Sequence, residues 1–172
     1  MEALFYCNLK SPVGELLLLG NGEALTGLYM QVQGFQKRAE SERRRDPAAF
    51  RDAREQLAAY FAGELKKFSL RLDATGTPFQ KRVWKGLRDI PYGRTESYGQ
   101  LAARIGAEGS ARAVGLANGR NPLGIIVPCH RVIGANGALT GYAGGIDNKR
   151  WLLAHEMRRT DFKLTAKESM HA

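Results

Sequence analysis

Apolar and polar residues along the first third of the chain alternate in the pattern that predicts β-strands. Leu4–Leu9 and Glu15–Leu19 are two predicted strands, and Leu25–Met30 is the strand that returns after the hairpin signal Asn21-Gly22. The next segment, Gln36–Arg45, is polar and densely charged, which predicts a mobile connection on the surface. The chain is therefore expected to begin with a small antiparallel sheet.

The pattern changes to a helical one at Asp46-Pro47, where proline suits the first position of a helix. The predicted helix ends at Gly63, and its apolar face comprises Phe50, Ala53, Leu57, Ala58, Tyr60 and Phe61. Lys67–Leu72 is a candidate for one more strand. A boundary is expected near residues 73–76, so we assign residues 1–74 to an N-terminal domain of sheet and helix.

Three short helices are predicted after this boundary. Thr77–Gln80 and Ser97–Gln100 are capping boxes, in which a hydroxyl and a glutamine three residues later satisfy the first backbone groups of a helix. Ser110 is the predicted cap of the third helix, Ala111–Asn118, which is rich in small residues that permit a close approach to a partner. Gly106 separates the second helix from the third, and the pair matches a helix-turn-helix.

A cysteine and a histidine stand next to each other in the run Val127-Pro128-Cys129-His130-Arg131-Val132. The apolar stretch Ile125–Val127 before them predicts a buried strand, which Pro128 should end or bend. A base beside a buried thiol can convert it to the thiolate, which is the form that attacks electrophiles. A free cysteine is often an inert core residue, but the flanking proline, histidine and arginine favour a nucleophile.

The last part of the chain combines a glycine-rich loop with a helix. Gly134–Gly145 contains Tyr142 and does not follow the dinucleotide or phosphate-loop patterns, so we expect it to wrap a pocket. A final helix is predicted over Asp147–Glu156, followed by a polar, frayed tail over Lys163–Ala172. The predicted fold class is α+β, with residues 75–160 forming a mostly helical second domain and residues 161–172 a polar tail.

The net charge of +9 suggests a polyanionic partner. Eight basic and three acidic residues lie from Lys81 to Arg120, so more than half of the excess charge falls on this one segment, which includes the predicted helix-turn-helix. No apolar run is long enough to cross a bilayer, and the N-terminus lacks a secretory pattern. Two cysteines without an export signal, Cys7 and Cys129, predict reduced thiols in a cytoplasmic protein, and no Cys/His cluster has the spacing of a metal site.

The second half of the chain resembles the O6-alkylguanine-DNA alkyltransferase family over residues 75–158. The motifs that carry the resemblance occur in the family's order and spacing: Thr77-Pro78-Phe79-Gln80, Val83-Trp84, Ile90-Pro91-Tyr92-Gly93, Ser97-Tyr98, Ala111-Arg112-Ala113-Val114-Gly115, Asn121-Pro122, Pro128-Cys129-His130-Arg131-Val132, Tyr142-Ala143-Gly144-Gly145 and Trp151-Leu152-Leu153-Ala154-His155-Glu156. The first domain fits the family's variable, ribonuclease H-like N-terminal domain more loosely. Some relatives carry a zinc site there, and this chain lacks the ligands for one.

The resemblance implies a DNA-repair enzyme that moves an alkyl group from guanine O6, with thymine O4 as a second candidate, onto its own cysteine. Cys129 would be the acceptor, and His130 would take its proton through a water, because neighbours in an extended segment point to opposite faces. Glu156 would hold the imidazole, and Tyr98 would protonate or hydrogen-bond the departing guanine. The thioether product is not reversed, so each chain would act once, without a cofactor.

The same resemblance implies how double-stranded DNA would be bound. The damaged nucleotide would be flipped out of the duplex, and the recognition helix would dock in the minor groove. The resemblance assigns DNA contacts to Arg112, which would fill the space left by the nucleotide, Ala113, Gly115 and Tyr98, and the base pocket to Asn121, Val132, Tyr142, Ala143, Gly144 and Lys149. It further implies a monomer without a membrane partner, with cooperative assembly on DNA left open.

Other interpretations remain open on the sequence alone. A noncatalytic damage-binding protein would share the fold, but Cys129 argues against that class. A Cys-His hydrolase would need an oxyanion hole, and it would leave the basic helix pair unexplained. A helix-turn-helix regulator that senses alkylation through Cys129 would bind one palindromic site. Taken singly, His130 also fits a core histidine, and Glu156 fits a helix-end ion pair.

Overall fold

The N-terminal part of the chain is a four-stranded sheet in the order β3-β2-β1-β4. This computed structural model describes the backbone of residues 3–30 and 35–171, and the side chains as far as Arg158. Strands β1 (Phe5–Ser11), β2 (Gly14–Gly20) and β3 (Leu25–Met30) pair antiparallel in sequence. The three predicted strands are therefore confirmed, and the turn at Asn21 is held by its side chain, which accepts hydrogen bonds from two following amides.

Both faces of this sheet are covered. Leu16 and Leu18 of β2 point into the main core, whereas Leu17 and Leu19 pack with Ala39 on the opposite face. Ala39 belongs to helix α1 (Phe35–Ser41), and β4 (Arg44–Arg45) follows it and pairs parallel with β1. The prediction of a mobile connection over Gln36–Arg45 is therefore wrong, because an apolar sheet face and a free strand edge order a segment whose own composition is polar.

Helix α2 (Arg51–Phe61) packs on the core side of the sheet. A 3-10 turn, η1 (Pro47–Phe50), precedes it, so helical structure begins at Pro47, as the sequence predicted. The helix buries Ala53, Leu57 and Tyr60, which confirms most of the predicted apolar face, but Ala58 is exposed and Phe61 is only half-buried. The candidate strand over Lys67–Leu72 is wrong, because this segment forms a single parallel bridge, from Leu72 to Leu25, rather than a ladder.

The C-terminal part contains helices α3 (Pro78–Arg88), α4 (Tyr98–Arg104) and α5 (Ala111–Gly119). Both predicted capping boxes are present, at Thr77 and at Ser97. Ser110 occupies the predicted cap position of α5, but its side chain makes no cap hydrogen bond. Helix α3 joins α5 through a hydrogen bond of 2.9 Å from the indole of Trp84 to the carbonyl of Ala117.

The segment that carries Cys129 is not the predicted strand. Turns occupy residues 124–126, Ile125 has a φ of 71°, and Cys129–Arg131 forms a 3-10 turn, η2. A β-branched residue rarely adopts a positive φ, so the surrounding contacts must hold it there. Extended structure begins only at β6 (Val132–Ile133), which pairs parallel with β5 (Glu96–Ser97) and so attaches the cysteine turn to the start of α4.

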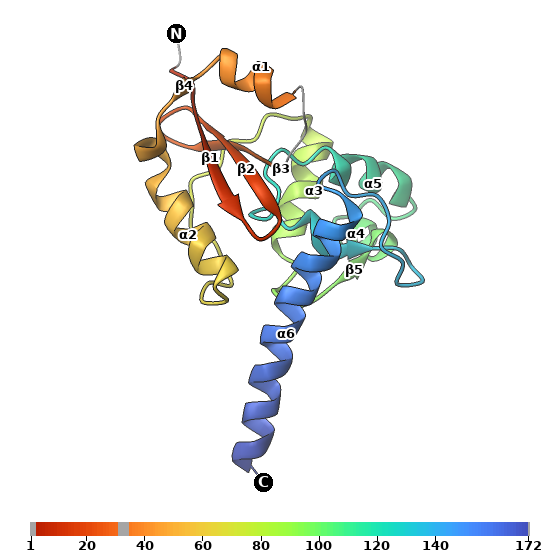
Figure 1. The fold of residues 1–172 in the computed structure, drawn as a ribbon. Coiled ribbons are helices and arrows are strands. Elements are labelled where there is room, and N and C mark those ends of the chain that lie inside the picture. The colour runs from red at the N-terminus through yellow and green to blue at the C-terminus, as the bar shows by residue number, and fades with distance from the viewer. Residues whose placement is uncertain (1–2, 31–34, 172) are drawn as a thin grey trace.

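The last helix, α6 (Ile146–His171), includes the predicted span over Asp147–Glu156 and continues beyond it. The structure thus shows helix where the sequence predicted a frayed tail from Lys163, and Ala172 lies outside the described residues. The C-terminal part of helix α6 projects away from the rest of the molecule, so the two termini lie at opposite ends (Figure 1). Among the described residues, no helix has the length and apolar character needed to cross a membrane.

Candidate active site

Cys129 lies at the wall of a small cavity that both parts of the molecule form. Its side chain is buried, and the cavity measures about 50 Å³. The lining residues are Leu28, Tyr29, Met30, Asn118, Gly119, Asn121, Gly124, Cys129, Gly141, Tyr142, Ala143 and Gly144. Burial raises the pKa of the Cys129 thiol, while Asn121, Lys149 and Tyr142 act in the opposite direction. The thiol is thus protonated in the resting site and needs a base to ionise it.

His130 is the buried imidazole next to this thiol. Its Nε2 lies 2.7 Å from Oε2 of Glu156. Since an ionised carboxylate only accepts hydrogen bonds, Nε2 must carry the proton and donate it. The other ring nitrogen, Nδ1, is buried and has no hydrogen-bond partner among the described residues. Burial lowers the pKa of His130 against the pull of Glu156, so the ring is neutral and its Nδ1 carries a lone pair that can accept a proton.

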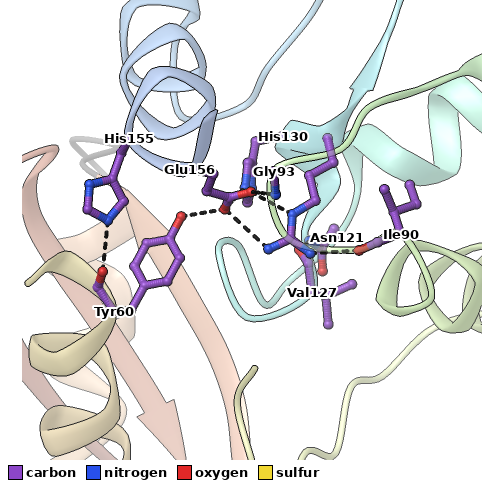
Figure 2. Close-up of polar contacts among 9 residues, drawn as sticks. Tyr60, Ile90, Gly93, Asn121, Val127, His130, His155 and Glu156 are labelled. Atoms are coloured by element: carbon purple, nitrogen blue, oxygen red, sulfur yellow. Dashed lines mark hydrogen bonds and ion pairs between the residues drawn. The ribbon is translucent and has the colours of Figure 1, made fainter. Parts of the chain in front are cut away.

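Glu156 is the acceptor at the centre of a buried network (Figure 2). Arg131 donates from Nε to Oε1 at 2.8 Å and from Nη2 to Oε2 at 3.2 Å. The hydroxyl of Tyr60 donates to Oε2 at 2.6 Å, and the Gly93 amide donates to Oε1 at 3.4 Å. Burial alone would raise the pKa of Glu156, but His130 and Arg131 outweigh burial and hold this pKa well below its usual range. The carboxylate is therefore anionic at neutral pH.

Two asparagines hold the turn that presents Cys129. The side-chain amide of Asn121 donates to the carbonyl of Val127 at 2.8 Å, and its oxygen accepts from the amide of Leu123 at 2.9 Å. Asn118 at the end of α5 donates to the carbonyl of Cys129 at 3.4 Å. These bonds replace the ladder that a strand would have supplied, which explains how an irregular segment can be buried.

Lys149 joins the start of α6 to β6 and to the middle of the glycine-rich loop. Its buried ammonium donates to the carbonyl of Val132 at 2.6 Å and to that of Thr140 at 3.0 Å. Burial lowers the pKa of Lys149, and the nearby Cys129 opposes that shift. The loop residues Tyr142, Ala143 and Gly144 then line the cavity. Val132, which the sequence assigned to the pocket, lies outside that lining, and its carbonyl already accepts the lysine.

The residues predicted to contact DNA lie apart from this network, on the helix-turn-helix. Arg112 and Ala113 are exposed on α5, and Leu116 on the same helix is 68% exposed. Gly115 lies against the ring of Tyr98, the first residue of α4. The Tyr98 hydroxyl donates to the carbonyl of Thr140 at 3.4 Å, and Tyr98 is not part of the cavity lining. The structure therefore brings these residues together with each other but not with Cys129.

Sequence reasoning missed two members of the buried network and one wall of the cavity. Tyr60 looked like an ordinary member of a helical apolar face, and Arg131 was noted only as a neighbour of Cys129. Pairing of Arg131 with a distant acid could have been suspected, because a buried arginine requires one. Leu28–Met30 of β3 gave no signal at all, since strand residues reach the cavity only through the packing of the two parts.

Comparison with known proteins agrees with this geometry. The family model described as 6-O-methylguanine DNA methyltransferase, DNA binding domain, matches residues 78–158, and the model described as the ribonuclease-like domain of the same enzyme matches residues 4–74. The chain belongs to the 6-O-methylguanine-DNA methyltransferase family. Its activity is the repair of DNA by transfer of an alkyl group from the damaged DNA to a cysteine of the protein.

Relatives and solved structures of this methyltransferase family cover almost the whole chain. The methylated-DNA–protein-cysteine methyltransferase of Mycobacterium tuberculosis is 56% identical over 94% of this chain and 98% of its own length, and that of Methanosarcina acetivorans is 51% identical over 89% and 98%. The crystal structure of the M. tuberculosis O6-methylguanine methyltransferase has a TM-score of 0.86 at 56% identity, covering 91% of this chain and 94% of that one. A structure of the M. tuberculosis protein in complex with DNA has a TM-score of 0.84 at 57% identity, covering 90% and 94%.

Proposed function

We propose that Cys129 is the alkyl acceptor and that His130 and Glu156 activate it. The observation that carries this proposal is the buried Nδ1 of His130, which has no hydrogen-bond partner among the described residues, in the residue that follows a cysteine lining a cavity. The other cysteine, Cys7, lies in the sheet core, and burial raises its pKa to about 11. The cavity at Cys129 and the imidazole of the following residue support Cys129 rather than Cys7 as the nucleophile.

The reaction is a displacement at the saturated carbon of the alkyl group. The Cys129 proton passes to Nδ1 of His130, through a water, and the resulting imidazolium is stabilised by Glu156. The thiolate forms a bond to carbon while the bond from carbon to guanine O6 breaks, and its electron pair stays on guanine. Tyr98 protonates or hydrogen-bonds the departing guanine. The product is a thioether, so each chain reacts once.

Binding of the damaged base requires the nucleotide to leave the duplex. The Cys129 sulfur is buried at the cavity wall and cannot reach O6 inside a stacked helix. Tyr142, Ala143 and Gly144 line the cavity and are the candidates to hold the base, with Asn121 and Lys149 fixing the two segments around it. Val132 is a weaker candidate, since its carbonyl would have to exchange Lys149 for the base.

The helix-turn-helix supplies the surface for double-stranded DNA. Arg112 and Ala113 are exposed on α5, and Gly115 leaves its backbone accessible to a close partner. We expect α5 to enter the minor groove, where base readout is degenerate and suits an enzyme that scans any sequence. The basic residues of this region provide salt-sensitive affinity. The protein is expected to act in the cytoplasm, as a monomer made of the two domains and without a cofactor.

The deciding experiment is the intact mass of the protein after incubation with a duplex that contains one O6-methylguanine. We expect a gain of one methyl group per chain, located on Cys129 by peptide mapping. Cys129→Ser should show no gain, and the matched variant Cys7→Ser should react like the wild type. Modification that follows Cys7, or a gain of several methyl groups per chain, would refute the proposal.

A further inference from the structure

Tyr60 is a buried tyrosine of the N-terminal domain whose hydroxyl reaches the acid of the C-terminal active site. It lies near the end of α2, 96 residues before Glu156 in the sequence, and its oxygen is 2.6 Å from Oε2. Figure 2 shows its ring pointing from α2 toward the carboxylate on α6. The same oxygen, Oε2, accepts the Nε2 proton of His130. The hydroxyl and the imidazole therefore share one acceptor atom.

The surroundings of Tyr60 keep its hydroxyl in this place. The side chain is fully buried, and its ring packs edge-on against Phe61, Tyr92 and His155. His155 donates from Nε2 to the backbone carbonyl of Tyr60 at 2.8 Å, which ties α2 to α6 one residue before Glu156. A tyrosine needed only for core packing would not have to place its hydroxyl on an anion, and phenylalanine would fill the same volume without burying a polar group.

Tyr60 also keeps its phenolic proton at neutral pH and so remains a donor. Burial, and then the charge of Glu156, raise the pKa of its phenol far above the usual range. The hydroxyl therefore cannot compete as an acid, and it lowers the proton affinity of the carboxylate in a constant way. Because the carboxylate then accepts the Nε2 proton of His130 less strongly, the imidazole is less basic at Nδ1.

We propose that Tyr60 is a positioning residue that sets the basicity of His130 by sharing Oε2 of Glu156, so that the N-terminal domain completes the active site. This inference rests on the proposed function, in which His130 is the proton acceptor for Cys129. It assigns the ribonuclease-like domain a part in the chemistry through one hydrogen bond across the interface.

Other charged and aromatic groups also surround Tyr60, Glu156 and His130. Arg131 from η2 donates to both oxygens of Glu156, and Lys149 from α6 lowers the proton affinity of His130 by its charge. Tyr92 lies against Tyr60 and under the guanidinium of Arg131. Replacement of the Tyr60 hydroxyl leaves all of these groups in place, so its effect is separable from theirs.

The test is the pH dependence of alkylation of the full chain by free O6-benzylguanine, which does not require DNA binding. In Tyr60→Phe the carboxylate loses one donor and binds the Nε2 proton more strongly, which raises the pKa of His130. We expect the midpoint of the acid limb, in a plot of alkylation rate against pH, to move to higher pH by roughly half a unit to one unit. Below this midpoint the reaction should slow about three- to tenfold, while the rate on the alkaline plateau should stay unchanged. Tyr6→Phe removes a hydroxyl from the sheet of the same domain, outside the network, and should not move the limb.

Two further readouts keep the test decisive. The NMR signal of the Nε2 proton of His130 should move downfield in Tyr60→Phe, since its bond to Glu156 strengthens, and this holds even where the acid limb is obscured by unfolding. Site-specific 3-fluorotyrosine at position 60 is a stronger donor and should move both the limb and the proton signal the opposite way. A uniform loss of rate with an unmoved midpoint and an unmoved signal would show that Tyr60 is only structural.

Failure of this inference is distinguishable from failure of the proposed function. A wild-type profile without an acid limb, together with a Glu156→Gln variant as fast as the wild type, would refute the role of His130 and Glu156. An intact wild-type limb that responds to Glu156→Gln but ignores both changes at Tyr60 would overturn the positioning role alone.

Discussion

The acid-base half of the site and the helix-turn-helix half differ in how their residues are held. Glu156 is fully buried, and donors from Tyr60, His130, Arg131 and Gly93 converge on it. Arg112 on α5 is exposed, and its surroundings on that helix face are small or apolar. The first half is organised in the free protein, whereas the second half, under the proposed function, would acquire its contacts with DNA. Chemistry requires fixed geometry, while scanning requires a surface that adapts to any sequence.

The largest effect is expected from Glu156→Gln. The amide cannot stabilise the imidazolium, and it leaves Arg131 buried beside an uncharged acceptor. We expect alkylation of both O6-benzylguanine and methylated duplex to slow by about 10²- to 10⁴-fold, and the free energy of unfolding to fall by about 3–5 kcal/mol. Single-turnover rates and urea unfolding measure the two losses.

Glu55→Gln is the matched control for this change. Glu55 pairs with Arg51 on the surface of α2 at 3.3 Å, and both side chains are largely exposed. Such a pair contributes about 0–1 kcal/mol to stability, so neither rate nor stability should change appreciably. Similar losses in the two variants would contradict a special role for the buried carboxylate.

Arg112→Ala should separate the two halves of the site. If Arg112 fills the space of the flipped nucleotide, its loss removes interactions that offset part of the few kcal/mol that flipping costs. A loss of about 1–2 kcal/mol corresponds to a roughly 5- to 30-fold slower reaction with methylated duplex, while the rate with free O6-benzylguanine should stay at the wild-type level. Equal losses with both substrates would rule out the flipping role.

Acid should destabilise the folded protein by protonating the carboxylate and the imidazole of the buried half of the site. The folded pKa of Glu156 is held well below its usual range, so the stability it contributes is complete above the unfolded pKa of about 4.3 and is lost as the pH falls from there. The folded pKa of His130 is lowered by burial, so below about 6.5 the unfolded chain gains a proton first and stability falls in the same direction.

Urea midpoints measured against pH test this sign. The wild type should lose stability steeply below about pH 5, and Glu156→Gln, which lacks the titrating carboxyl, should show a flatter profile there. Parallel profiles for the two proteins would assign acid sensitivity to other groups.

The smallest effect is expected from Gly115→Ala on α5. A methyl group at this position would lie 3.6 Å from the ring of Tyr98, which is ordinary contact. Alanine in a helix is favoured over glycine by about 0.5–1 kcal/mol, so the free protein should become slightly more stable in thermal unfolding. DNA affinity should nevertheless decrease, because the added methyl obstructs a close approach of the groove to the helix. A gain in stability with unchanged DNA affinity would show that α5 does not approach DNA at this glycine.

Local patterns along the chain were sufficient for most elements, and they point to Cys129 as the proposed nucleophile. Strands β1 to β3 follow alternation, α3 and α4 begin at capping boxes, and the run around Cys129 and His130 shows its chemistry in the residue types themselves. The order of Gln36–Arg45 and the turn at Cys129 were not predictable, because a sheet face and the side chain of Asn121 supply interactions that the segments themselves do not encode.

The sequence by itself determined the α+β class, the two successive parts and the motif that places a thiol beside a base. Only the tertiary structure decided which groups surround that pair. Tyr60 and Glu156 are 96 residues apart, and their 2.6 Å hydrogen bond exists because α2 and α6 pack together. Periodicity records which face of a helix is buried, but it does not record which buried atom meets which, and that pairing sets the proton affinities on which the reaction depends.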